Sequence, residues 1–268
     1  MRNKNKIECF VNKASSFDEA LLLVFFLFFL YSCKSPVYKE REAVAVERTI
    51  DSVSVVPQTN FKIDTLARLE KYFIDLGLVN VSTLDSTIQK QLRYSSFSNV
   101  LEKDLYGGLS EVYLETETAA KLVLANTFLQ QENPQLRLLI WDAARPVYIQ
   151  KLLWDSLHTK MGHNQQYLSH PSKHSLHNYG AAVDLTLVDT AGNLLDMGTD
   201  FDYFGALAEP TKEAELLAAK LLTLEQITNR KILRTAMQKG GFSAIPSEWW
   251  HFNACSKTYA ASKYKLIN

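Results

Sequence analysis

Hydrophobic residues recur at helical spacing in four segments of the chain. The first, residues 66–76, is followed by Gly77, which stands where a helix would end. The same spacing predicts helices over residues 116–131 and 146–157, the second of which opens on Pro146. A fourth, long helix is predicted over residues 212–239, because two glycines follow it directly.

Three short apolar runs have the length of strands rather than helices. They cover residues 136–141, 182–188 and 249–253. Helices and strands occur in clusters and do not alternate strictly, which favours an α+β fold with a small antiparallel sheet and helices packed against it. Residues 61–268 have an ordinary length for one domain and show no internal repeat.

The longest apolar run, residues 20–31, lies near the start of the chain. Its twelve residues fall short of the ~20 that a membrane-spanning helix needs. Basic residues precede the run, and Leu30-Tyr31-Ser32-Cys33, which resembles a bacterial lipobox, ends it. We therefore expect residues 1–32 to be a lipoprotein signal peptide, Cys33 to carry a lipid anchor and residues 33–60 to form a flexible tether.

This interpretation places the protein on the periplasmic side of a bacterial cell envelope, bound to the membrane through Cys33. The alternative is a buried helix or an anchor that stays uncleaved. Asp18 and Glu19 precede the apolar run directly, at a place where signal peptides are usually basic.

Charge and cysteine content narrow the possible chemistry. Lysine and arginine number 29, as do aspartate and glutamate, so the formal charge is zero and no general basic field attracts nucleic acid. Three cysteines are too few for a disulfide framework or a thiolate zinc cage. A metal site would therefore use histidine and carboxylate ligands.

Such ligands stand in two motifs. In Ser175-x-His177-x-x-Gly180-x-Ala182-x-Asp184, the glycine allows a tight turn and the small alanine leaves room on the strand face that Asp184 shares. His177 and Asp184 can then converge on one ion, with His174 as the less favoured alternative to His177. A single histidine is more often solvated or part of the core, so the evidence lies in the combination.

The second motif is Glu248-Trp249-Trp250-His251. Two histidines and one aspartate leave one position of a tetrahedral zinc site open for water. Glu248 is then the natural general base for that water. Taken alone, the glutamate would be solvated and the two tryptophans would belong to a core or an interface.

Together these motifs resemble the VanX-type D-alanyl-D-alanine dipeptidases, zinc D,D-peptidases that share a fold with the hedgehog signalling domain. The resemblance covers residues 87–252. It rests on Leu105-Tyr106-Gly107, Trp141-Asp142-Ala143-Ala144-Arg145-Pro146, Ala182-Val183-Asp184-Leu185-Thr186-Leu187, Met197-Gly198-Thr199-Asp200-Phe201-Asp202 and Glu248-Trp249-Trp250-His251. It implies one Zn²⁺ per chain, bound by His177, Asp184 and His251, with Glu248 as the base.

The resemblance also implies roles for four other residues. Arg145 matches an arginine near the substrate carbonyl, where a permanently charged guanidinium can stabilise an oxyanion; an ion pair with Asp142 is the alternative. Asp202 matches the acidic residue that faces the substrate amino group, and Tyr94 an aromatic at the same end of the pocket. Ser175 is expected to bind the substrate carboxylate or, alternatively, to make a local loop hydrogen bond.

The expected function is hydrolysis of D-Ala-D-Ala, or a related small D,D-dipeptide, at the cell envelope. One alternative is a D,D-carboxypeptidase that trims peptidoglycan stem peptides. Another is a zinc-binding envelope lipoprotein without activity, although binding alone requires neither Glu248 nor Arg145. The chain also departs from the family in reading Asn178-Tyr179 before Gly180 and in carrying the lipobox and tether.

Overall fold

The computed structural model describes residues 68–160, 162 and 167–268. The expected signal peptide, the lipidated Cys33 and the tether lie outside these residues, as does the expected start of the domain at residue 61. In the described part of the chain, no helix has both the length and the apolar character needed to cross a membrane.

A five-stranded sheet forms the centre of the described part, in the order β2-β4-β5-β7-β6. The two long strands, β4 (Leu136–Asp142) and β5 (Ala182–Asp189), pair antiparallel at its middle. β7 (His251–Asn253) pairs antiparallel with β5, and β6 (Ser243–Ala244) with β7. β2 (Gln89–Lys90) runs parallel to β4. The sheet is therefore mixed, whereas the sequence predicted an antiparallel one.

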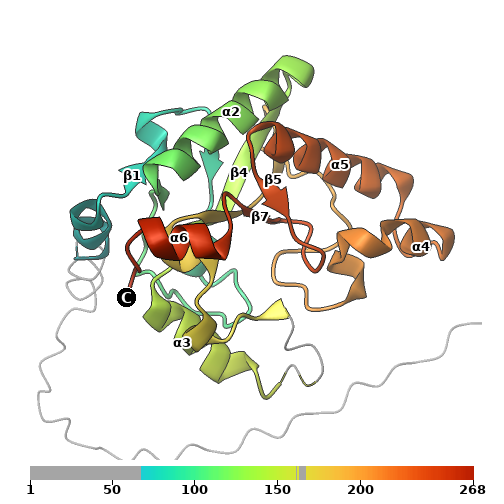
Figure 1. Cartoon of the computed structure of the whole chain (residues 1–268). Helices are drawn as coiled ribbons and strands as arrows, with labels where there is room; N and C mark the ends of the chain where they lie inside the picture. The colour runs from blue at the N-terminus through green and yellow to red at the C-terminus, as the bar shows by residue number, and fades with distance from the viewer. Residues whose placement is uncertain (1–67, 161, 163–166) are drawn as a thin grey trace, which may run out of the picture. The chain divides into compact units, whose positions relative to one another are not determined.

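Two helices cover one face of this sheet and lie side by side, α2 (Thr116–Glu132) and α5 (Leu224–Lys239) (Figure 1). The buried positions of α2 recur every three or four residues, as the sequence pattern predicts. Gly240 ends α5 against α2, where an added Cβ would lie 2.5 Å from the Lys121 carbonyl oxygen. This close approach explains why the helix ends on a glycine.

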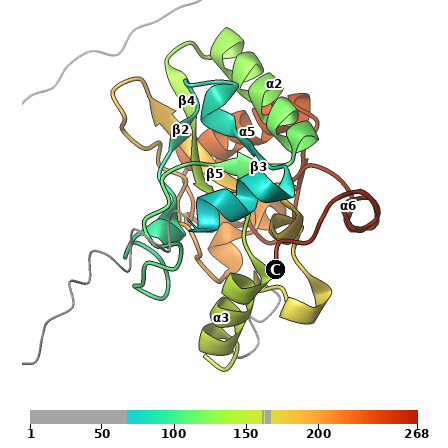
Figure 2. The same ribbon diagram turned by 90° about the vertical axis from the view of Figure 1, so that its left-hand side faces the viewer.

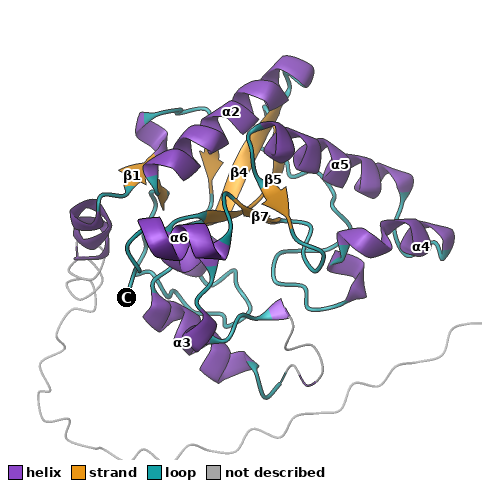
Figure 3. Ribbon diagram, viewed as in Figure 1, coloured by secondary structure: helices purple, strands orange, loops and turns teal. Residues whose placement is uncertain are grey.

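α3 (Val147–Leu157) lies apart from these two helices, at the bottom of both views (Figures 1 and 2). α6 (Lys257–Lys263) follows the last strand near the C-terminus, and residues 68–76 form a further helix that Gly77 ends with φ +94°. β1 (Val79–Asn80) and β3 (Tyr113–Leu114) form a separate antiparallel pair. Figure 3 shows the helices arranged around the strands, which confirms the α+β fold.

The single long helix predicted over residues 212–239 is wrong. The structure has α4 (Glu213–Ala218) and α5, separated by a turn in which Lys220 has a φ of +58°. Thr223 starts α5 with a capping box: its hydroxyl accepts from the Gln226 backbone N–H at 3.1 Å, and its own N–H donates to Gln226 Oε1 at 2.8 Å. These bonds satisfy backbone groups that would otherwise lack partners at the start of a new helix. The chain can therefore turn before Thr223, although the helical spacing of its hydrophobic residues continues.

Candidate metal and dipeptide site

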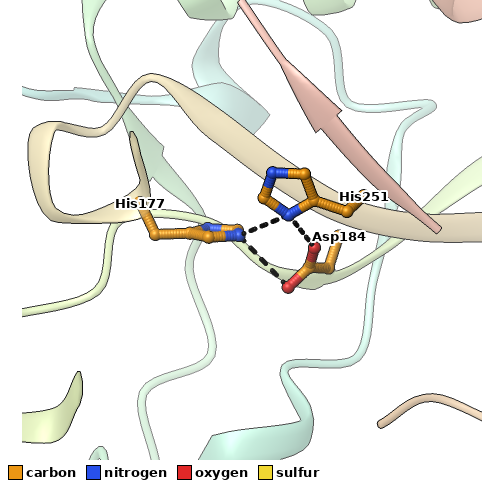
Figure 4. Close-up of side chains that lie close together, drawn as sticks. All are labelled: His177, Asp184 and His251. Carbon is orange, nitrogen blue, oxygen red and sulfur yellow. Dashed lines mark hydrogen bonds and ion pairs between the residues drawn. The ribbon is translucent and has the colours of Figure 1, made fainter. Parts of the chain in front are cut away.

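Three side chains from three elements converge at the end of the central strands. His177 Nε2 lies 3.2 Å from Asp184 Oδ2, and His251 Nδ1 lies 2.9 Å from Asp184 Oδ1 (Figure 4). The two imidazole nitrogens are 3.2 Å apart. In the part of the chain that the structure describes, this is the one cluster of histidine, cysteine and carboxylate side chains suited to a metal ion.

Local backbone structure explains the convergence. Asp184 in β5 and His251 in β7 are directly opposite in the antiparallel register, so their side chains lie on the same face. His177 belongs to a short 3-10 helix, η5 (Leu176–Tyr179), which Ser175 and Asn178 cap reciprocally. Gly180 then turns the chain into β5 with a φ of +61°, as expected for this glycine.

The outer nitrogens of both histidines are bound to oxygen acceptors. His177 Nδ1 lies 2.7 Å from the Ala143 carbonyl oxygen, and His251 Nε2 lies 2.8 Å from Asn253 Oδ1. When a metal ion is bound, the outer nitrogen that faces such an acceptor keeps the ring proton, and the inner nitrogen is free to coordinate the ion. The two inner nitrogens and the Asp184 carboxylate therefore form one donor set.

This donor set fits a divalent metal. Two imidazole nitrogens and carboxylate oxygen suit Zn²⁺, and the outer hydrogen bonds orient the rings as in known zinc sites. His177 and Asp184 are 1% and 3% exposed. Burial raises the pKa of Asp184, but His177 and His251 outweigh it and hold that pKa well below its usual range. The carboxylate is thus charged at neutral pH.

All eight residues assigned to the site from the sequence line one cavity of about 210 Å³. Besides the three candidate ligands, these are Tyr94, Arg145, Ser175, Asp202 and Glu248. The cluster thus lies in a pocket that also holds two further carboxyl groups and a guanidinium.

Glu248 stands in the turn before β7, and its Oε2 is 4.0 Å from His251 Nδ1. Burial raises the pKa of Glu248 to about 8, an effect that His251 opposes and that Asp184 and Asp202 reinforce. A carboxyl group with a raised pKa can take up and release a proton near neutral pH. The two tryptophans that follow are 2% and 1% exposed and belong to the core.

Arg145 is buried beside the cluster. It makes the ion pair with Asp142 that the sequence analysis gave as the alternative to a role at the substrate carbonyl. Its Nε donates to Asp142 Oδ2 at 2.8 Å, while an outer guanidinium nitrogen lies 3.4 Å from Asp184 Oδ2. Burial lowers the pKa of Arg145, but the Asp142 carboxylate outweighs it and raises that pKa well above its usual value. The ion pair thus keeps a fixed positive charge at the cavity wall.

Asp202 and Tyr94 meet at another part of the cavity. The Tyr94 hydroxyl donates to Asp202 Oδ2 at 2.9 Å. Burial raises the pKa of Asp202 to about 7, although the Tyr94 hydrogen bond and the charge of Arg145 oppose this shift. The cavity therefore contains an acidic group that ionises near neutral pH.

Two other residues considered from the sequence, Ser175 and His174, make local contacts. The Ser175 hydroxyl accepts a long hydrogen bond of 3.4 Å from the His177 backbone N–H, which is the local loop contact considered as an alternative. His174 lies outside the metal cluster and packs edge-on against Tyr179, with 6.3 Å between ring centroids.

Sequence reasoning missed three residues that support the site. Tyr106 donates to Asp142 at 2.7 Å, Asn253 is the acceptor for His251, and Gln150 contacts Arg145. Asn253 could have been found, because it stands two positions after His251 and so shares its strand face. Tyr106 and Asp142 lie 36 positions apart, and although Gln150 follows Arg145 by only five positions, nothing in the local pattern indicates either contact.

The sequence model of a peptidase family described as "D-ala-D-ala dipeptidase" matches residues 75–267. A D-alanyl-D-alanine dipeptidase of Escherichia coli (strain K12) is 31% identical over 175 residues, which are 65% of this chain and 83% of the relative.

Two further relatives have the same name. The protein of Enterococcus faecium is 25% identical over 207 residues, which are 71% of this chain and 98% of the relative. The protein of Synechocystis sp. is 27% identical over 183 residues, which are 58% of this chain and 74% of the relative.

Proposed function

The chain belongs to the D-Ala-D-Ala dipeptidase family of metal-dependent peptidases, and we propose that it is a zinc enzyme that hydrolyses D-Ala-D-Ala or a closely related D,D-dipeptide. One observation carries the proposal: the cluster of His177, Asp184 and His251 shares a single cavity with Glu248 and Asp202. A metal site, a proton carrier and an acceptor for an amino group are the parts that a dipeptidase needs.

Zinc bound by the three ligands would polarise the scissile carbonyl and make a water molecule acidic enough to attack at neutral pH. The chain's own groups do the rest. Glu248 takes the proton from the attacking water and delivers it to the nitrogen of the leaving D-alanine. Its position close to His251 Nδ1 suits both transfers. Its pKa of about 8 belongs to the metal-free site, and a bound Zn²⁺ would lower this pKa and favour the carboxylate that accepts the proton.

Arg145 stabilises the oxyanion that forms when water adds to the peptide carbonyl. Its guanidinium is fixed by Asp142 and remains charged, so it needs little reorganisation as negative charge develops. Ser175 lines the same cavity, and its hydroxyl is the proposed contact for the substrate carboxylate.

Asp202 selects a free dipeptide by pairing with its ammonium group. A charge taken out of water is costly unless it is paired, so an ammonium needs this carboxylate whereas an N-acylated peptide gains nothing from it. Tyr94 positions the carboxylate through its hydrogen bond. This pairing separates the proposed dipeptidase from a carboxypeptidase that acts on stem peptides.

The sequence supports a location at the cell envelope. We propose that the lipobox-like segment is cleaved before Cys33 and that the cysteine carries the lipid anchor. In a bacterial host, we expect wild type to incorporate labelled palmitate and a Cys33→Ala variant to incorporate none. Equal incorporation by the two chains would contradict the anchor.

The experiment that tests the activity measures D-alanine release by the purified full-length chain loaded with zinc. Free D-Ala-D-Ala and an N-acylated peptide ending in D-Ala-D-Ala are compared, and Glu248→Gln is the control. We expect turnover of the free dipeptide and a loss of about 10²–10⁴-fold in kcat for the variant. Preference for the blocked peptide would show a carboxypeptidase, and no turnover despite bound zinc would indicate a binding protein.

A further inference from the structure

Gln150 is a buried amide that joins the guanidinium of Arg145 to the wall of the cavity. It lies in the first turns of α3 and is 1% exposed. Its Oε1 accepts from the Nη1 group of Arg145 at 2.8 Å, and its Nε2 donates to the Ser169 carbonyl oxygen at 2.9 Å. Both halves of the amide therefore have protein partners.

The two partners fix the orientation of this amide. A guanidinium only donates and a carbonyl only accepts, so the oxygen of Gln150 must face Arg145 and its nitrogen must face Ser169. A residue without this donor and acceptor pair cannot replace it. The choice of glutamine on a buried face of α3 is thus explained by the two contacts and not by hydrophobic packing.

Gln150 and Asp142 hold different nitrogens of the Arg145 guanidinium. Asp142 accepts from Nε at 2.8 Å and Gln150 accepts from Nη1, while Nη2 lies 2.6 Å from Asp142 and 3.4 Å from Asp184. Without Gln150, Nη1 would be a buried donor with no partner, which costs free energy. The guanidinium would then turn so that Nη1 meets another acceptor, and it would move away from Asp142 and Asp184.

We infer that Gln150 is a positioning residue: it acts through Arg145 and holds its guanidinium where the oxyanion develops. The inference rests on the proposed function, because it assigns Arg145 to the reaction. Ser169 also lines the cavity, so the same amide links the guanidinium to the segment that precedes η5. Preorganised donors of this kind accelerate the chemical step and contribute little to ground-state binding.

The test uses Gln150→Met, which keeps the size of the side chain and removes both polar groups. In the zinc-loaded full-length chain we expect kcat for D-Ala-D-Ala to fall about tenfold and KM to change less than about threefold. Asn126→Leu is the matched control, because Asn126 is also a fully buried helix amide, bonded to Asp85 and Thr87 in another part of the fold. It should lower stability and leave kcat unchanged.

A double-mutant cycle with Arg145→Ala separates positioning from a general structural effect. Turnover is followed together with calorimetric binding of a phosphinate analogue of D-Ala-D-Ala, which reports on the site even where turnover is too slow to measure. Zinc content is determined for every variant. We expect Gln150→Met to weaken analogue binding about tenfold in the wild-type background and less than about twofold beside Arg145→Ala.

The loss of analogue binding caused by Gln150→Met is compared between the wild-type and Arg145→Ala backgrounds. A loss at least about threefold larger in the wild-type background supports the inference, and a smaller difference overturns it. A loss of zinc in Gln150→Met alone would also overturn it, because the effect would then pass through the metal cluster. If the wild-type chain neither cleaves the dipeptide nor binds the analogue, the proposed function fails and the assignment of Gln150 falls with it. Failure of the inference alone leaves wild-type turnover intact.

Discussion

The hydroxyl of Tyr94 donates a hydrogen bond of 2.9 Å to the Asp202 carboxylate, although 108 positions separate the two residues in the sequence. This bond favours the charged form of Asp202, whereas burial raises its pKa to about 7. The charge of this carboxyl group therefore depends on its burial, on the Tyr94 hydroxyl, on the nearby charge of Arg145 and on the occupant of the cavity. Asp202 is therefore the residue at which substrate choice and pH dependence can be tested together.

Asp202→Asn should raise KM for free D-Ala-D-Ala by about 10–100-fold, because a charge-assisted hydrogen bond contributes roughly 1.5–3 kcal/mol. KM for an N-acylated peptide ending in D-Ala-D-Ala should change little, since this ligand has no ammonium group. Steady-state kinetics on both substrates measure the difference. Asp200→Asn is the control, because its side chain is 74% exposed and lies two positions away. Equal losses on both substrates would remove the assigned role of Asp202.

The same substitution should stabilise the free protein at alkaline pH. The pKa of Asp202 rises from 3.8 to about 7 on folding, so between these values the folded chain holds a proton that the unfolded chain has lost. The contribution of Asp202 to the unfolding free energy therefore falls as pH rises through this range. The asparagine side chain of the variant cannot ionise, so we expect Asp202→Asn to exceed wild type by on the order of 1–3 kcal/mol at pH ~8.

Urea unfolding of both chains at pH ~5 and pH ~8 measures this difference. Other titrating groups are common to the two proteins and cancel in the comparison. The stability gain of the variant should shrink toward the lower pH. A gain that is the same at both values would show that Asp202 does not titrate between them.

Asn253→Leu should weaken zinc binding by about 10–100-fold, because the acceptor that orients His251 is lost. With no acceptor at Nε2, the ring can carry its proton on Nδ1, the nitrogen that faces Asp184. Competition with a chelating dye measures the affinity. Asn193→Leu is the control, since Asn193 bonds to Asp189 at the far end of β5. Unchanged affinity in Asn253→Leu would contradict the assignment of Nδ1 as the ligand atom.

Gly240→Ala should destabilise the fold by about 1–3 kcal/mol. The new Cβ would lie 2.5 Å from the Lys121 carbonyl oxygen and 2.6 Å from the Ala125 Cβ, so α2 and α5 must move apart. Denaturant unfolding gives the loss. Gln238→Ala, on the exposed side of α5, should stay within about 0.5 kcal/mol of wild type. A Gly240→Ala protein as stable as this control would show that the helices can separate freely.

The longer elements could be predicted from the sequence because each carries a full hydrophobic period. α2 and β5 begin at their predicted residues, and α3 ends at its predicted residue. β1, β2, β3 and β6 have two residues each, too few to show any period. The break between α4 and α5 depends on the capping box of Thr223, which competes with a hydrophobic spacing that would allow the helix to continue.

The three candidate ligands, His177, Asp184 and His251, and the candidate base Glu248 could be proposed from the sequence because they stand in compact motifs, and all four line the cavity. The hydrogen bonds that support these residues could not be predicted. Tyr106 reaches Asp142 across 36 positions, and Gln150 reaches Ser169 across 19, through contacts that exist only once the chain has folded. A motif specifies the groups that carry the chemistry, whereas the bonds that orient them depend on the tertiary structure.

The direct pairing of Asp184 with His251 also determines when the site can exist during synthesis of the chain. His177 and Asp184 lie close in sequence and are made together, but the third candidate ligand is made 67 residues after Asp184. The nascent chain has only two of the three groups until β7 adds to the edge of β5. Tight capture of the ion then coincides with completion of the sheet, so incomplete chains would remain metal-poor and inactive.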